Sequence, residues 1–108
     1  MTTSNGAPLA LTRVELMAGE EADAIAEAAA RKTPNVIVER VPGLVLISAP
    51  GWLAFDCADV SEEFGAPWDT RRLQIIMAAY AGYITQMDEQ GVELRWDASN
   101  SPAVADAS

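Results

Sequence analysis

The sequence predicts an α+β fold in which a βαββ unit is followed by a βααββ unit, the two sharing one small core. Short runs rich in β-branched, leucine and aromatic residues predict the strands, and turn signals such as Pro42-Gly43 and Pro50-Gly51 separate them. Other segments carry apolar residues at helical spacing after an acidic residue, which predicts helices. A chain of 108 residues buries enough surface for one such core.

The fold is expected to begin with a strand and a helix. Apolar residues alternate with charged ones over residues 12–17, which favours a half-buried strand. A helix is expected over residues 20–32, because acidic residues occupy its first turn and a Thr-Pro pair follows it. Glu27 is four residues before Arg31, so these two side chains are expected to pair. The buried stripe of the helix is composed mostly of small residues: Ala22, Ile25, Ala26 and Ala29.

A hairpin is expected next. Residues 36–41 and 44–49 are β-branched and leucine-rich, and they flank Pro42-Gly43. Because a type II Pro-Gly turn does not match the twist of a two-residue hairpin, we expect a loop of three to five residues there. A further short strand is expected over residues 52–55, after Pro50-Gly51.

A short helix is expected after Asp56, which is a favourable N-cap residue. Cys57, Val60 and Phe64 then fall on one helical face, and Gly65 suits the left-handed C-terminal position. We interpret the cysteine as a buried structural thiol, because the chain has no histidine that could serve as its base. The carboxylates of this helix are interpreted as a solvated face and not as metal ligands: Asp56, Asp59, Glu62 and Glu63.

A second short helix is expected after Asp69, and its apolar spacing continues as far as Ile84. Gly82 and the β-favouring residues after it indicate a strand within the same stretch, and periodicity alone does not place the change from helix to strand. The last strand, over residues 92–96, is expected to pair with the strand before it. Two tryptophans on expected strands are predicted to pack in the core: Trp52 and Trp96.

Composition excludes several classes of function. The chain has 7 basic and 16 acidic residues and a net charge of −9, so neither a nucleic acid nor a membrane is an expected partner. Residues 1–8 lack the features of a secretory signal and no apolar run is long enough to span a bilayer, which predicts a cytoplasmic protein. Without histidine and with a single cysteine, we expect no catalytic, cofactor-binding or metal-binding residues.

The domain is expected to cover residues 12–97. Residues 1–11 and 98–108 are rich in Ser, Thr, Asn, Ala and Pro and have no apolar period. We therefore predict a flexible tail at each end of the domain.

Candidate interaction residues are concentrated between Trp68 and Tyr83. Arg71 and Arg72 either pair with nearby acids or contact a partner, because arginine and tryptophan are favoured at the centres of interfaces. Residues 76–82, with the sequence IMAAYAG, place small side chains around one tyrosine. These small residues either pack closely within the fold or form a low-relief surface for the helices of another protein, and composition does not decide between the two.

Several motifs together resemble a known family. They are MAGEEADAI at 17–25, the hydrophobic hairpin at 36–47, VSEEFGAPWD at 60–69 and LQIIMAAYAGYI at 73–84. The motifs of the second half are the more specific ones. The chain resembles the small regulatory component, also called the effector or coupling protein, of bacterial multicomponent di-iron monooxygenases, which oxidise methane, phenol, toluene, alkenes and isoprene.

The resemblance implies a boundary for the second short helix. It is expected to end near Ile76, with a strand over residues 78–87 after it. In similar proteins the segment matching residues 76–80 faces the hydroxylase and affects substrate entry. An asparagine is usual where Ile76 stands in this chain.

The resemblance also implies a function without chemistry of its own. The chain is expected to be a cofactor-free effector, monomeric when free, that binds the hydroxylase above its di-iron centre and tunes oxygen activation, substrate access and coupling. The short N-terminal tail favours the toluene, alkene and isoprene group of systems. The expected hydroxylase-interface residues are Trp68, Asp69, Arg71, Arg72, Ile76, Ala78, Ala79, Tyr80, Gly82 and Tyr83. The alternatives are a small-molecule-binding regulatory module, in which residues 76–83 line a ligand pocket, and a small carboxylate-dependent enzyme.

Overall fold

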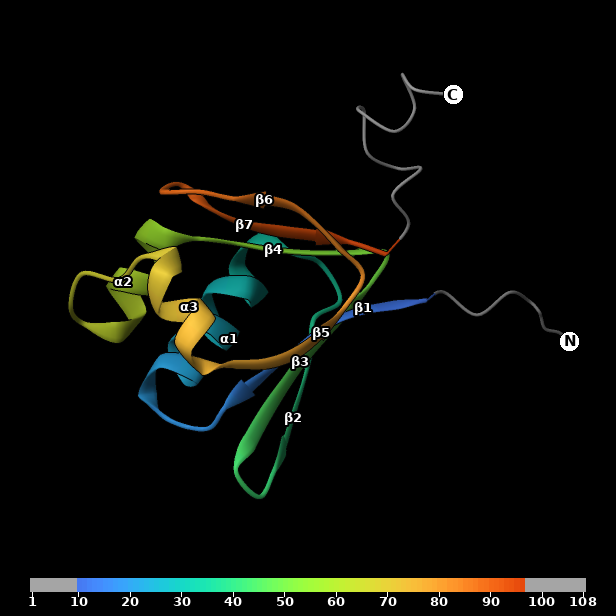
Figure 1. Ribbon diagram of the computed structural model, residues 1–108, viewed down its shortest axis with the longest axis horizontal. Helices are drawn as coiled ribbons and strands as arrows, with labels where there is room; N and C mark the ends of the chain where they lie inside the picture. The colour runs from blue at the N-terminus through green and yellow to red at the C-terminus, as the bar shows by residue number, and fades with distance from the viewer. Residues whose placement is uncertain (1–9, 97–108) are drawn as a thin grey trace, which may run out of the picture.

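The computed structural model describes residues 10–96, which form three helices and seven strands (Figure 1). The elements are β1 (Leu11–Met17), α1 (Glu20–Lys32), β2 (Ile37–Val41), β3 (Leu44–Pro50), β4 (Trp52–Asp56), α2 (Cys57–Phe64), α3 (Thr70–Ile76), β5 (Met77–Ala81), β6 (Tyr83–Met87) and β7 (Gly91–Arg95). The predicted α+β class is therefore confirmed. Of the predicted tails, residues 1–9 and 98–108 lie outside the described residues, as does Asp97 of the predicted domain, and Leu11 already belongs to β1.

The strands form two antiparallel sheets, one with the order β2-β3-β1-β5 and one with the order β4-β7-β6. In the first sheet β1 pairs with β3 along its full length, from Leu11 opposite Pro50 to Met17 opposite Leu44. Helix α1 lies in the angle between the two sheets and packs against β4, β3 and α2 (Figure 1). This arrangement gives the molecule one core between the sheets.

The core depends on the close approach of α1 to its neighbours. All four residues of the predicted stripe are buried, and Ala24 and Ala28 are buried as well, because α2 covers a second side of α1. The larger side chains of the core come mainly from the strands: Leu16, Ile47, Leu53, Phe55 and Leu94. Alanine on the helix and large residues on the sheets let these elements pack close together.

The strand expected over residues 78–87 is divided at Gly82. The segment before the glycine, β5, belongs to the four-stranded sheet, and the segment after it, β6, belongs to the three-stranded sheet. Gly82 has a φ of 121°, and a Cβ atom at this position would lie 2.9 Å from the carbonyl oxygen of Arg95. Only glycine fits this close approach without strain, and it lets the chain pass from one sheet to the other.

The hairpin turn differs from the prediction. Val41 pairs directly with Leu44, so Pro42 and Gly43 form a two-residue connection and the expected loop of three to five residues is wrong. Gly43 has a φ of 83°, and its carbonyl oxygen accepts a hydrogen bond of 3.0 Å from the N–H of Ala18. This bond ties the turn to the end of β1 and offsets its poorer match to the strand twist.

The two strand tryptophans are less buried than predicted. Trp96 is 45% exposed, because it follows the last paired residue of β7. Trp52 is half-buried; it lies opposite Arg95 on the face of its sheet that points away from the core. The prediction that both pack in the core is therefore wrong.

Candidate functional site

The connection between α2 and α3 is anchored by Trp68, which is only 4% exposed. Its indole ring packs against Phe55 with a centroid separation of 6.3 Å. The hydroxyl of Ser61 accepts a hydrogen bond of 2.9 Å from the backbone N–H of Trp68 and donates to its carbonyl oxygen at 3.3 Å. The indole Nε1 donates to Glu21 Oε2 at 3.0 Å. Trp68 was predicted as an interface residue, but in this structure it offers very little surface to a partner.

Helix α3 begins with a side-chain cap and carries two exposed arginines. Asp69 Oδ1 accepts a hydrogen bond of 2.9 Å from the backbone N–H of Arg71, which confirms the predicted cap. The guanidinium of Arg71 also pairs with this carboxylate, and the hydrogen bond holds the pKa of Asp69 below its usual value. Arg72 Nε donates to Glu21 Oε2 at 2.6 Å. Both arginines therefore pair with nearby acids, and both remain accessible from solvent.

The pairing with Arg72 also affects the acid. The hydrogen bond from its guanidinium, more than any other contact, lowers the pKa of Glu21. Burial of the carboxylate opposes this effect, and the hydrogen bond from the Trp68 indole supports it. Glu21 is thus held in its charged form between α1, Trp68 and α3.

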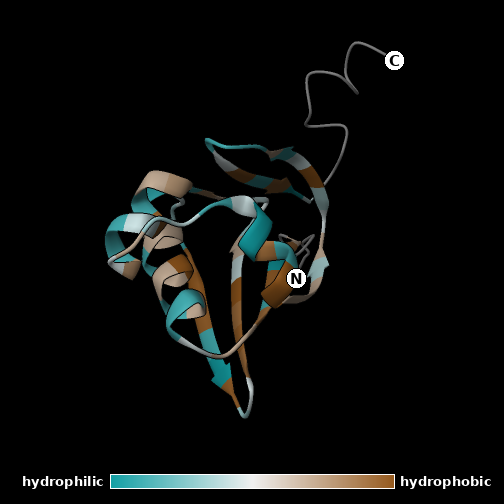
Figure 2. Ribbon diagram, turned by 60° about the vertical axis from the view of Figure 1, so that its left-hand side comes forward, coloured by the Kyte–Doolittle hydropathy of each residue, from teal (hydrophilic) through white to brown (hydrophobic). Residues whose placement is uncertain are grey.

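Large apolar side chains are exposed along α3, β5 and β6. Figure 2 shows that α3 changes from hydrophilic residues at its start to hydrophobic residues at its end, where β5 begins. Ile75 is the most exposed of these apolar side chains, at 75%, and Tyr80 and Tyr83 are each about half exposed. We call the exposed apolar residues of this segment the α3–β5–β6 surface; they are Ile75, Ala78, Ala79, Tyr80, Tyr83 and Ile84.

The position of these strands explains the exposure. β5 is the last strand of one sheet and β6 is the last strand of the other, so the segment forms an edge of both sheets. Ala78 and Ala79 are exposed, so the edge is low in relief where these small residues lie. Ile76 is only half-buried and packs against the core, and Gly82 is half-buried at the corner between the strands.

Sequence reasoning missed Ile75. The sequence feature that could have identified Ile75 is its place on the helix. Leu73 is fully buried and Ile76 packs against the core, which leaves Ile75 on another side. An exposed apolar side chain that belongs to a larger apolar patch is a candidate for contact with another molecule.

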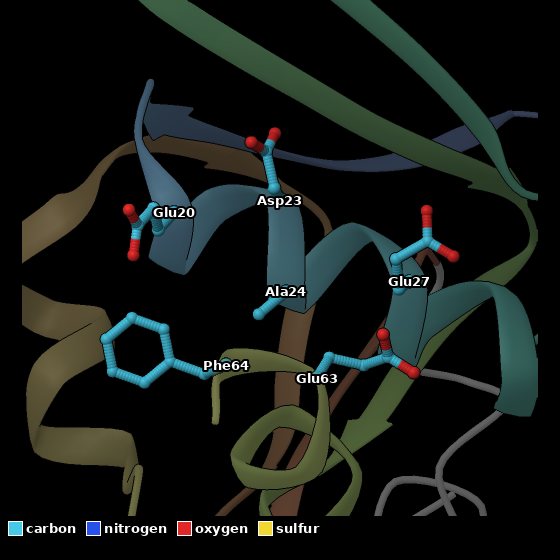
Figure 3. A pocket seen from close by; sticks show the side chains of 6 residues that line it. All are labelled: Glu20, Asp23, Ala24, Glu27, Glu63 and Phe64. Atoms are coloured by element: carbon cyan, nitrogen blue, oxygen red, sulfur yellow. The ribbon is translucent and has the colours of Figure 1, made fainter. Parts of the chain in front are cut away.

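Acidic residues gather at a second place, between α1 and α2. A cavity of about 280 Å³ is lined by Glu20, Asp23, Ala24, Glu27, Glu63 and Phe64 (Figure 3). A second cavity, of about 300 Å³, is lined by Asp69, Thr70, Arg71, Asp88 and Glu89. Neither cavity includes a residue of the segment 76–83, which the small-molecule alternative places around a ligand.

The carboxylates of α2 have partners that the sequence did not reveal. Arg31 contacts Asp59 at 3.2 Å, Glu62 at 2.7 Å and Glu63 at 2.6 Å, so it reaches α2 and not Glu27, and the predicted pairing within α1 is wrong. A second ion pair joins the end of α1 to the start of α2: Lys32 Nζ lies 2.7 Å from Asp56 Oδ1. Over residues 10–96, no three acidic or cysteine side chains are arranged to hold a metal ion.

The cysteine of α2 is inside the protein. Cys57 is 6% exposed, and burial raises the pKa of its thiol above the usual value. The interpretation of this residue as a buried structural thiol is therefore confirmed. Across residues 10–96, no helix combines the length and the apolar character that crossing a bilayer requires.

The architecture defines an α+β protein in which two antiparallel sheets enclose one central helix. Residues 12–95 match the model of the MmoB/DmpM family, so the chain belongs to this family and the resemblance drawn from the sequence is confirmed. No curated protein matches the chain significantly.

Solved structures share the fold. One chain from a structure of the phenol hydroxylase–regulatory protein complex superposes with a TM-score of 0.71 at 22% identity, covering 82% of this chain and 100% of that chain. A second structure of such a complex gives a TM-score of 0.67 at 23% identity, with 81% and 100% covered. The soluble methane monooxygenase regulatory protein B gives a TM-score of 0.62 at 16% identity, with 89% and 74% covered.

Proposed function

We propose that this chain is the non-catalytic regulatory component of a bacterial di-iron monooxygenase and that it binds the hydroxylase through the α3–β5–β6 surface. Membership of the MmoB/DmpM family supports the role, as does the fold shared with chains of the phenol hydroxylase–regulatory protein complexes. The observation that carries the choice of surface is the exposure of large apolar side chains on α3 and on the edge strands β5 and β6.

The chemistry of this surface suits a protein partner. Exposed isoleucine and tyrosine side chains gain free energy when a partner removes them from water, and aromatic residues are enriched at the energetic centres of interfaces. The exposed alanines, Ala78 and Ala79, let a partner helix approach the β5 backbone closely. Arg71, with its guanidinium largely in solvent, supplies a charged group at the start of the helix that carries Ile75.

The regulatory effect follows from differential binding. A protein that contributes no reactive group shifts a hydroxylase between states only by binding one state more tightly than another. A tenfold shift requires about 1.4 kcal/mol of difference in binding free energy. We propose that this difference tunes oxygen activation, substrate access and the coupling of reductant to product.

The resemblance to the regulatory components of di-iron monooxygenases supports more specific proposals about substrate type, location and oligomeric state. We propose a hydrocarbon system of the toluene, alkene or isoprene type, and a chain that acts in the cytoplasm and is monomeric when free. Ile76 stands where similar proteins have an asparagine, and it packs partly against the core. We therefore assign this position a packing role and place the partner contacts at the exposed residues around it.

A reconstituted system tests the function. The chain is added to purified hydroxylase and reductase, and product formed is measured per NADH consumed. We expect the chain to raise both the rate and this ratio, while the chain alone forms no product. Turnover by the chain alone, or failure to associate with the hydroxylase, contradicts the proposal.

A further inference from the structure

The side chain of Glu21 links α1 to the connection before α3 and to α3 itself, the helix that carries Ile75 of the proposed surface. Glu21 Oε2 accepts hydrogen bonds from the indole of Trp68, at 3.0 Å, and from the guanidinium of Arg72, at 2.6 Å. The Glu21 side chain is 19% exposed, and it belongs to the first turn of α1. Two donors that are close in sequence, one before α3 and one within it, thus converge on a single oxygen atom of another helix.

Helix α3 has few other attachments to the rest of the fold. Leu73 is its only buried residue, Ile76 packs partly against the core, and Gln74 donates a weak hydrogen bond to the sulfur of Met87. The pair between Asp69 and Arg71 joins residues at the helix's own start, so it does not fix the helix against the core. Arg72, in contrast, reaches Glu21 and also lies over the ring of Phe64, at 5.8 Å from its centroid. Among the residues that the structure describes, the pair with Glu21 is the ion pair that joins α3 to another helix.

The charge of Glu21 matters for both contacts. Hydrogen bonds that involve an ionised partner are about twice as strong as those between neutral groups. Removal of the carboxylate leaves the indole N–H of a buried tryptophan without its acceptor, and such unpaired groups are costly. It also frees Arg72, so that α3 is held by Leu73, by the partly buried Ile76 and by the segments before and after the helix.

We propose that Glu21 is a positioning residue, which fixes the orientation of α3 through Trp68 and Arg72 and thereby presents Ile75 to the hydroxylase. The inference rests on the proposed function, because it assigns a task to a residue behind the proposed surface. Glu21 makes no contact with the hydroxylase in this proposal. Its effect on binding passes through the helix that carries the most exposed apolar side chain.

The test compares E21A, E21Q and the control E20Q in the full chain. Glu20 precedes Glu21 in the same acidic turn and is exposed, so E20Q removes a charge of the same sign from the same place. The dissociation constant for the hydroxylase is measured for each variant, alone and combined with I75A. The indole N–H signal of Trp68 is followed by nuclear magnetic resonance, and its identity is established with W68F.

We expect E21A to weaken hydroxylase binding by roughly three- to tenfold and to shift the Trp68 indole signal. E21Q keeps an acceptor oxygen for both donors but loses the charge, so its affinity should lie between those of E21A and the unchanged chain, and E20Q should bind like the unchanged chain. With Ile75 already replaced, E21A should weaken binding by less than twofold, since the side chain that it positions is gone.

Two results overturn the inference while the proposed function stands: E21A shifts the indole signal without weakening binding, or its effect is equally large with and without Ile75. If neither E21A nor I75A changes the affinity, the proposed surface is wrong and the inference falls with it. If E21A does not fold, E21Q decides, because it keeps the size and shape of the side chain and removes only its charge. We then expect a two- to threefold loss of affinity, and unchanged binding overturns the inference.

Discussion

Replacement of Ile75 by alanine tests the α3–β5–β6 surface directly. Complete burial of an isoleucine side chain is worth about 1.5–3 kcal/mol. Since Ile75 is 75% exposed in the free chain, a partner that covers it gains about three quarters of this, or about 1–2 kcal/mol. I75A should therefore raise the dissociation constant for the hydroxylase by roughly 5- to 30-fold.

The stability of the free chain provides the contrast. Surface substitutions usually change the free energy of unfolding by less than about 0.5 kcal/mol, so the melting temperature of I75A should stay close to that of the unchanged chain. Isothermal titration calorimetry with purified hydroxylase measures the affinity. The matched control is I37A, because Ile37 is 46% exposed on β2, at the opposite edge of the four-stranded sheet. Unchanged affinity of I75A, or an equal loss in I37A, refutes the reasoning.

Three further results are expected. G82A should lower the free energy of unfolding by about 1–3 kcal/mol, because its Cβ atom would meet a carbonyl oxygen at a positive φ. G43A, which has open space around its Cβ atom, should lower it less. Equal melting temperatures for the two variants contradict this difference. The Glu21 carboxyl has a lowered pKa in the folded chain, so the stability from its pair with Arg72 is present above the unfolded pKa of 4.5 and is lost as pH falls through the folded pKa. The free energy of unfolding of E21Q, measured by chemical denaturation, should therefore depend less on pH in the acid range. Cys57 should react slowly with iodoacetamide until the chain unfolds, and rapid labelling of the folded chain would show that the thiol is accessible.

Elements with local end signals were predictable from the sequence. The bounds of α1 match the prediction, since acidic residues begin it and a Thr-Pro pair ends it. Helix α2 ends at Gly65 in the left-handed conformation, and Asp69 caps α3, both as expected from single residues. The change from α3 to β5 had no such signal, and only the resemblance to a family placed it near Ile76.

Features that depend on distant partners were not predictable. The corner at Gly82 exists because the backbone of Arg95 passes beside it. The indole N–H of buried Trp68 has its acceptor in Glu21, which is 47 residues away in the chain. Arg31 was assigned the nearest suitable acid along its own helix, whereas the fold brings the carboxylates of α2 closer. In each case the deciding contact is tertiary, and neither propensity nor periodicity contains it.

The corner between β5 and β6 couples local unfolding in the two sheets. These strands are successive in the chain and belong to different sheets, so detachment of the segment breaks hydrogen bonds to β1 and to β7 together. Neither sheet loses its last strand without disturbing the other. Amide hydrogens along residues 77–87 should therefore exchange with solvent as one cooperative unit. The two sheets should unfold together, although each has its own network of hydrogen bonds.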